Sequence, residues 1–127
     1  ETEQYGRRMG EKLGGGETIV LSGPLGSGKT TLTKGIGRGL GVVEVITSPS
    51  FAIMNEYQGR LNLFHFDFYR LEDPGEMEDL LEEYLYRDDG VVVVEWGEAV
   101  MQVLESYIRL VLAVRNGGRV ITREEVP

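Results

Sequence analysis

The stretch TIVLSGPLGSGKT, residues 18–30, joins a short apolar segment to a glycine-rich loop. Residues 18–22 are β-branched and mostly apolar, which is typical of a buried parallel strand. Residues 23–30 match the pattern G-x-x-x-x-G-K-[S/T] completely. Glycines let such a loop wrap so that backbone N–H groups point at phosphate oxygens, and the next helix aims its positive dipole end at the same anion. The stretch therefore predicts a phosphate-binding loop between a buried strand and a helix that begins at Lys29.

Two side chains of this loop carry chemistry of their own. We expect the Lys29 ammonium to reach the β- and γ-phosphates of a nucleotide as a point charge, and the Thr30 hydroxyl to ligate Mg²⁺. The alternative is a glycine-rich turn that binds no ligand, but the strand before the loop and the helix after it favour nucleotide binding. The loop residues expected to contact the nucleotide are Gly23, Leu25, Gly26, Ser27, Gly28, Lys29, Thr30 and Thr31.

Helices and strands alternate on both sides of the loop. Apolar residues at helical spacing predict a helix over 2–13, and a second helix follows over 29–40, in which Gly35 and Gly39 allow a close approach to a sheet. The remaining elements are predicted as a hairpin of strands 51–57 and 61–69, a helix from Asp73 with apolar positions up to Leu85, a strand over 91–94, and strands 107–114 and 119–123 around a tight turn. This order predicts an α/β fold, a three-layer sandwich with a mixed parallel and antiparallel sheet flanked by helices.

Carboxylates at the ends of two predicted strands are candidate partners of the loop. A phosphate loop needs an acid, usually at the end of an apolar strand, to hold Mg²⁺ or its waters. Glu95 follows four valines and is the better match. The alternative is that Glu95 is simply the first exposed residue after a buried strand. Asp67 shares one strand face with His65 and Tyr69, opposite three phenylalanines, and is a candidate for orienting or deprotonating an attacking water. The alternative for Asp67 is a strand-end acid bonded to the local backbone.

Three neighbouring features allow either a structural or a functional interpretation. A lone histidine such as His65 is more often a hydrogen-bonded structural residue than a catalyst. The segment Thr-Ser-Pro-Ser at 47–50 is either an ordinary turn or a hydroxyl-bearing loop that senses the γ-phosphate. Trp96, directly after Glu95, either packs near the site or belongs to the core or an interface.

Composition excludes several other classes of function. A chain of 127 residues predicts one domain, 1–127, and its 41% hydrophobic and 27% charged residues are ordinary for a globular protein. No apolar run is long enough for a membrane helix, and 13 basic against 21 acidic residues give a net charge of −8, unsuited to gripping nucleic acid or anionic lipid alone. Zero cysteines and one histidine exclude disulfides and cysteine or multi-histidine metal sites, and fit a reducing cytoplasm.

These pieces occur together in one family. The chain resembles TsaE (also called YjeE), bacterial P-loop ATPases needed to make threonylcarbamoyladenosine at position 37 of certain tRNAs. A phosphate loop alone is shared by many families, whereas its combination with S-P-[ST]-[FY], H-x-D-x-Y-R and E-W is specific. The matching motifs are SGPLGSGKTT at 22–31, TSPSF at 47–51, NEY at 55–57, HFDFYRL at 65–71 and VEW at 94–96. The resemblance covers about residues 2–123 and implies a P-loop NTPase fold.

The resemblance also implies roles for single residues. Lys29 and Thr30 would hold phosphate and Mg²⁺, Glu95 would complete the Mg²⁺ shell, and Asp67 would act with Lys29 in hydrolysis of ATP. Residues 48–51 would form a switch-like loop. The further residues expected near the nucleotide are Thr2, Ser50 and Arg119.

Partners and activity follow from the same resemblance. The family works with TsaD and TsaB, which transfer the carbamoyl group to tRNA, and ATP hydrolysis by TsaE resets that complex. The acidic charge fits a subunit that meets tRNA only through the complex. We expect a Mg²⁺-dependent ATPase that is slow alone, because no arginine finger in a mobile basic lid is evident. The alternatives are a small-molecule P-loop kinase, disfavoured by scattered arginines and the acidic segment 76–83, and a nucleotide-dependent assembly factor that does not hydrolyse ATP.

Overall fold

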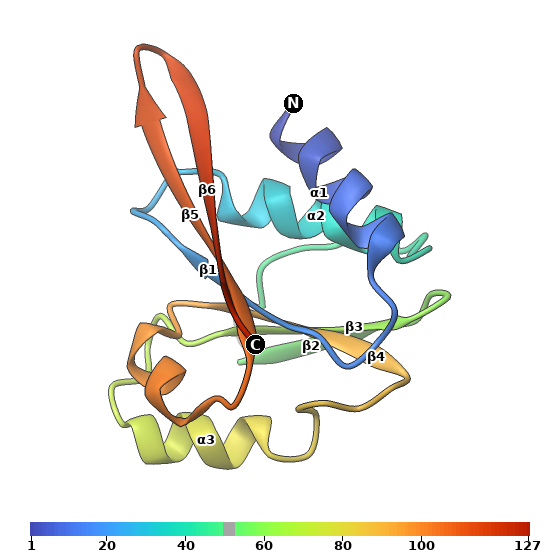
Figure 1. The fold of residues 1–127 in the computed structure, drawn as a ribbon, viewed down its shortest axis with the longest axis vertical. Coiled ribbons are helices and arrows are strands. Elements are labelled where there is room, and N and C mark those ends of the chain that lie inside the picture. The colour runs from blue at the N-terminus through green and yellow to red at the C-terminus, as the bar shows by residue number, and fades with distance from the viewer. Residues whose placement is uncertain (50–52) are drawn as a thin grey trace.

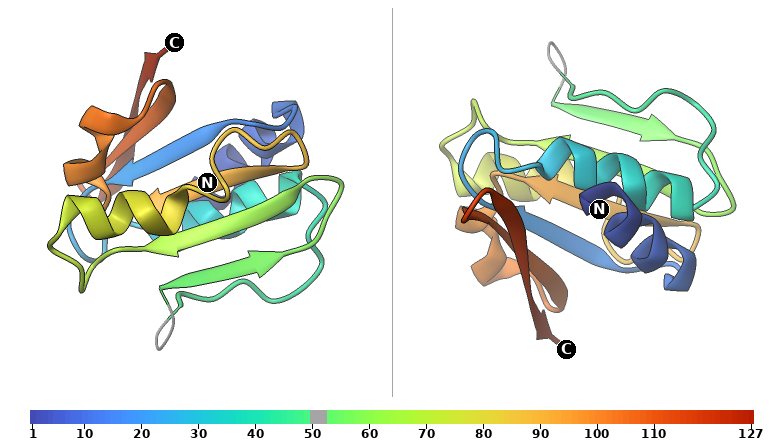
Figure 2. Two further views of the ribbon diagram at one scale, coloured as in Figure 1. Left: turned by 90° about the horizontal axis from the view of Figure 1, so that it is seen from below. Right: turned by 90° about the horizontal axis from the view of Figure 1, so that it is seen from above.

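The computed structural model describes residues 1–49 and 53–127 and arranges them in three layers (Figure 1). The helices α1 and α2 cover one face of a central sheet, and α3 and the short 3₁₀ helix η1 lie on the other (Figures 1 and 2). The helical elements are α1 (Thr2–Lys12), α2 (Lys29–Gly39), α3 (Pro74–Leu81) and η1 (Glu98–Val103). The strands are β1 (Thr18–Ser22), β2 (Met54–Tyr57), β3 (Asn62–Asp67), β4 (Gly90–Glu95), β5 (Tyr107–Arg115) and β6 (Gly118–Val126).

The strands of the described residues form one mixed sheet in the order β2-β3-β4-β1-β5-β6. Neighbours among β3, β4, β1 and β5 are parallel, and the outer strands β2 and β6 are antiparallel to β3 and β5. The predicted α/β class and mixed sheet are confirmed. Because the carboxyl ends of the parallel strands meet at one edge, this edge is where an open α/β sheet binds ligands.

Alternation along the strands separates the core into two clusters. In β4, Val91 and Val93 pack beneath α1 and α2, whereas Val92 and Val94 pack toward α3. The three phenylalanines of 64–68 are buried on the α3 side, as the period-2 pattern predicts. None of the helices in the described parts of the chain is long and apolar enough to cross a bilayer.

Some local predictions were wrong. The helix α3 ends at Leu81, and Leu80, predicted on its apolar face, is 37% exposed. The next residues form turns, from which Tyr84 packs its ring against Phe64 and Phe66 at centroid distances of 5.0 and 5.5 Å. No sequence pattern predicts η1, and the first two residues of the predicted strand 51–57 lie outside the described residues.

Gly35 and Gly39 of α2 face another helix rather than the sheet, whereas Gly37 faces Ile46 and the β3 residue Leu63. A Cβ on Gly35 would lie 2.1 Å from the carbonyl oxygen of Glu3, and one on Gly39 would lie 2.3 Å from that of Arg7. Both obstructing atoms belong to the backbone of α1. The predicted approach to a sheet is therefore wrong for these two residues: they let α1 pack directly on the backbone of α2, which leaves the first residues of α1 beside the glycine-rich loop.

Candidate functional site

The glycine-rich loop takes the predicted place between strand and helix. The strand β1 ends at Ser22, α2 begins at Lys29, and the loop contains Gly23, Gly26 and Gly28 with φ of 146°, 78° and 104°. These left-handed values favour glycine because other side chains are strained there. At Gly23 a Cβ would also meet the Leu112 carbonyl oxygen at 2.6 Å. The loop shape therefore depends on the glycine positions of the motif.

Lys29 is a buried cation with two contacts. Its side chain is covered although it belongs to the first turn of α2, and Nζ donates a hydrogen bond to the Gly23 carbonyl oxygen. Nζ also lies 3.4 Å from the centroid of the Trp96 ring, a cation–π contact. Burial lowers the pKa of Lys29, while the negative charges of Glu95, Glu98 and Asp67 oppose this shift. The ammonium is thus held inside the loop by groups that an anion can replace.

The two candidate carboxylates come together because their strands are neighbours. Asp67 and Glu95 are register partners at the ends of β3 and β4. Glu95 is only 3% exposed, so it is not simply the first exposed residue after a buried strand. Asp67 is half-buried and accepts a hydrogen bond from the Tyr69 N–H at 3.0 Å, so its local backbone contact is present as well.

The environment of Asp67 makes its carboxylate more basic. Burial raises the pKa of Asp67, and the Glu95 charge adds to this rise. The Tyr69 N–H and the positive charges nearby oppose it. A carboxylate with a raised pKa is a stronger hydrogen-bond acceptor for water and a better general base.

A cavity of about 380 Å³ connects the loop with both carboxylates. It contains Ser48 from the predicted hydroxyl-bearing segment, whose Oγ is 3.0 Å from the Thr30 Oγ1. Trp96 also lines it while packing against the core cluster on the α3 side, so both interpretations of this residue hold. Tyr69 packs on Trp96 at a ring-centroid distance of 5.0 Å. The lining residues are Leu25, Gly26, Gly28, Lys29, Thr30, Thr31, Ser48, Asp67, Tyr69, Glu95, Trp96 and Arg119.

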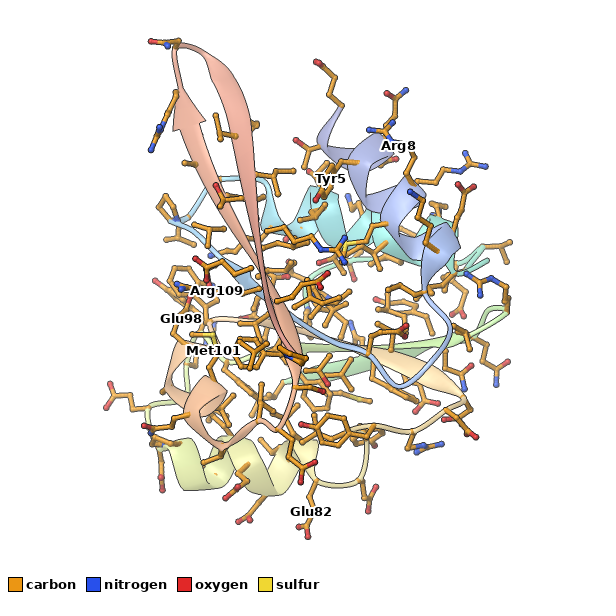
Figure 3. The ribbon with its side chains drawn as sticks, in the orientation of Figure 1. Tyr5, Arg8, Glu82, Glu98, Met101 and Arg109 are labelled. Carbon is orange, nitrogen blue, oxygen red and sulfur yellow. The ribbon has the colours of Figure 1, made fainter. Side chains whose placement is uncertain are left out.

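A larger cavity of about 600 Å³ adjoins the first and shares Gly28, Thr31 and Arg119 with it. The start of α1 and the β5–β6 hairpin form its walls, and these two segments lie side by side (Figures 1 and 2). Thr2 lines this cavity, as does Arg119. Tyr5 and Arg8 of α1 line it too (Figure 3). Neither residue is predicted as part of a site, because Tyr5 lies at the apolar spacing of a core position and no sequence pattern points to Arg8.

The oxygen atoms that line the smaller cavity suit a hard metal cation as ligands. The Thr30 hydroxyl and the carboxylates of Asp67 and Glu95 all line it. Oxygen ligands suit Mg²⁺, which keeps several waters and needs only one or two protein ligands besides substrate phosphates. Within residues 1–49 and 53–127 there is no cluster of three or more His, Cys, Asp or Glu that could hold a metal alone. The residues present therefore fit a cation that phosphate oxygens help to hold.

Most of the predicted site residues lie close together in the structure. The structure brings together Leu25, Gly26, Gly28, Lys29, Thr30, Thr31, Asp67, Glu95 and Arg119 at one cavity, with Thr2 at the adjoining one. Gly23 shapes the loop and accepts the Lys29 hydrogen bond, and the Ser27 side chain is buried in the loop. Ser50, also predicted near the nucleotide, lies outside the described residues.

Comparisons with known proteins agree with the motif combination. The family model "Threonylcarbamoyl adenosine biosynthesis protein TsaE" matches residues 1–123. A relative from Treponema pallidum, named tRNA threonylcarbamoyladenosine biosynthesis protein TsaE, is 40% identical over 124 residues, 96% of this chain and 92% of the relative. A Nostoc relative of the same name is 41% identical over 122 residues, 92% of this chain and 75% of the relative. The crystal structure of Bacillus subtilis YdiB superposes with a TM-score of 0.82 at 32% identity, covering 99% of this chain and 79% of that one.

Proposed function

The chain belongs to the TsaE family of tRNA threonylcarbamoyladenosine biosynthesis proteins, and from this premise we propose that it binds and hydrolyses ATP in that pathway. The observation that carries the proposal is the convergence of Lys29, Thr30, Asp67 and Glu95 at one cavity. These residues come from three separate elements. Together they supply an ammonium group for the phosphates, a hydroxyl and two carboxylates. We also propose that residues 1–127 act as one ATPase domain in the cytoplasm, where tRNA is modified.

The phosphate groups of ATP fit the loop for electrostatic reasons. Backbone N–H groups of the loop and the amino end of α2 provide positive partial charge, and Lys29 adds a full charge. On binding, the γ-phosphate would replace the Gly23 carbonyl oxygen and the Trp96 ring as the partner of the Lys29 ammonium. This exchange gives the buried ammonium a direct anionic partner in place of two neutral ones.

Mg²⁺ would be held by the Thr30 hydroxyl, the Glu95 carboxylate and phosphate oxygens, and when bound it neutralises charge that develops on the phosphates. Asp67 lies beside Glu95 and faces the same cavity. Its raised pKa suits a group that orients the attacking water and accepts its proton. The adjoining cavity would take the ribose and base, with Thr2, Tyr5 and Arg119 in its wall.

The partners in the proposal are TsaD and TsaB, and tRNA is reached only through their complex. The net charge of −8 supports an indirect contact with tRNA, because an acidic surface repels the phosphate backbone. In this proposal ATP hydrolysis is slow alone and is driven by the TsaD–TsaB complex.

Phosphate release from Mg²⁺-ATP, measured with and without the TsaD–TsaB dimer, tests the proposal. Asp67→Asn should lower the stimulated rate by about 100-fold or more, the usual scale for losing a general base, while nucleotide affinity changes only a few-fold. Asp89→Asn makes the same chemical change at an exposed ion pair with Arg87, and it should leave the rate unchanged. A rate that responds to added nucleosides or sugars but not to the dimer would contradict the proposal and favour a small-molecule kinase. Full tRNA modification by Asp67→Asn and Glu95→Gln variants that no longer hydrolyse ATP would favour an assembly factor instead.

A further inference from the structure

His65 lies beneath the proposed site and makes one hydrogen bond within it. It is in the middle of β3, has no exposed surface, and its Nε2 is 2.6 Å from the Oε2 of Glu95. The contact is diagonal, since the register partner of His65 is Val93 and that of Glu95 is Asp67. The Glu95 side chain therefore leans back along its strand to reach the imidazole.

The direction of this hydrogen bond follows from the chemistry of the two groups. An ionised carboxylate has only acceptor sites, so the imidazole Nε2 carries a hydrogen and donates it. The other ring nitrogen, Nδ1, is buried and has no hydrogen-bond partner within the described parts of the chain. Burying a polar atom without a partner destabilises the folded state, so an apolar side chain would fill this place more favourably. What the histidine contributes that an apolar residue cannot is the bond to Glu95.

We propose that His65 is a positioning residue that engages one oxygen of Glu95 and leaves the other, Oε1, to act toward Mg²⁺ at the phosphate cavity. This inference rests on the proposed function. A carboxylate with one oxygen engaged by a neighbour binds a metal, or a metal-bound water, through its single remaining oxygen. Mg²⁺ suits such one-oxygen binding, because its small octahedral shell keeps several waters, whereas Ca²⁺ takes up to eight oxygens and often uses both oxygens of a carboxylate.

Two consequences distinguish this role from simple packing. Removal of the donor should weaken the Mg²⁺-dependent part of nucleotide binding by about 10- to 100-fold, the scale usual for losing the hydrogen-bond partner of a metal ligand. Nucleotide binding without a divalent cation should stay the same, because the side chain of His65 bonds to Glu95 and His65 is not among the described residues that line the phosphate cavity. The ratio of the Mg²⁺ effect to the Ca²⁺ effect should also fall, because Glu95 then has both oxygens available.

The test measures ADP binding to the full chain in EDTA, in Mg²⁺ and in Ca²⁺. Trp96 is the single tryptophan of the sequence and lines the cavity, so its fluorescence reports binding, with calorimetry as an independent check. The variants are His65→Leu, which removes the donor, and His65→Gln, whose amide N–H₂ extends about as far as Nε2. His65→Leu should lose the Mg²⁺ effect, and His65→Gln should keep it within about threefold. Equal binding of all variants in EDTA shows that each is folded.

A double-mutant cycle makes the inference sharper. Glu95→Gln should lose the same Mg²⁺ effect as His65→Leu, and the double variant should lose no more than either alone, because both changes remove one unit. Additive losses would overturn the inference, as would a His65→Leu variant with the full Mg²⁺ effect or a His65→Gln variant as impaired as His65→Leu. If the unmodified protein binds ADP equally with and without Mg²⁺, the proposed magnesium site itself fails, and the role of His65 fails with it.

Discussion

Replacing Gly35 by alanine should destabilise the protein, although alanine is the better helix former. Gly35 lies within α2, where α1 crosses it. A Cβ at this position would lie 2.1 Å from the Glu3 carbonyl oxygen and 3.1 Å from the Arg7 nitrogen, both backbone atoms of α1. Since ordinary contacts begin near 3.4 Å, α1 would have to move away by about 1.3 Å.

The expected magnitude is a difference between two opposing effects. Glycine to alanine in a helix interior gains about 1 kcal/mol of helix propensity. Overpacking costs typically 1–3 kcal/mol, and the upper end applies here because the obstructing atoms are backbone atoms that cannot change rotamer. The free energy of unfolding should therefore fall by about 2 kcal/mol, which lowers Tm by roughly 6–10 °C for a chain of this size.

Gly75→Ala is the matched control. Gly75 is in the first turn of α3, and the nearest atom to an added Cβ is 3.3 Å away on the flexible Asp73 side chain. The Tm of the Gly75→Ala variant should stay the same or rise slightly, because almost no steric overlap opposes the gain in helix propensity. Both variants are compared by calorimetric melting without nucleotide. A Gly35→Ala protein that melts at or above the temperature of the parent would refute the inferred contact between α1 and α2.

A second readout connects this contact to the proposed site. The start of α1 lines the larger cavity through Thr2, one residue before Glu3. A displaced α1 should widen this cavity, so Gly35→Ala should weaken ADP binding more than Gly75→Ala does. Unchanged ADP affinity together with a lowered Tm would contradict the link between this helix contact and the larger cavity, because the obstructing atom belongs to Glu3 in the cavity wall.

Three further predictions concern single side chains. Arg60 donates hydrogen bonds to the carbonyl oxygens of Gly10, Leu13 and Gly39 at the ends of α1 and α2, so Arg60→Ala should lower the free energy of unfolding in urea by about 1–2 kcal/mol, and an unchanged midpoint would contradict this role. Asp73 accepts a hydrogen bond from the Gly75 N–H at the start of α3, so Asp73→Ala should cost about 1 kcal/mol, while the same change at exposed Asp79 should cost much less. Burial raises the pKa of Asp67 above its unfolded value, so the ionised carboxylate destabilises the native state at any pH above that pKa. Asp67→Asn should therefore raise Tm at pH 8, and melts at decreasing pH should show this gain shrink as the parent carboxyl becomes protonated; a gain that grows would contradict the assignment.

Local patterns predicted the elements well where one segment determines its own structure. The loop between β1 and α2 follows from glycines that need left-handed backbone angles and from the apolar run before them. The alternation in 63–68 correctly assigned the phenylalanines to one face and His65 and Asp67 to the other. The end of α3 was placed too late, because Tyr84 is apolar at helical spacing yet packs from a turn that follows the helix.

The sequence by itself determined the phosphate loop, the alternation of helices and strands, and the acids that end β3 and β4, because each depends on residues close together in the chain. The tertiary structure decided which of these segments meet. Parallel pairing of β3 and β4 brings Asp67 beside Glu95 and His65 beneath it, which no spacing within one segment specifies. Likewise, glycine in α2 permits a close approach to any backbone, and only packing of the whole chain made that partner α1 rather than the sheet. Burial then lowers the pKa of Lys29 and raises that of Asp67, since desolvation depends on every element that covers these side chains.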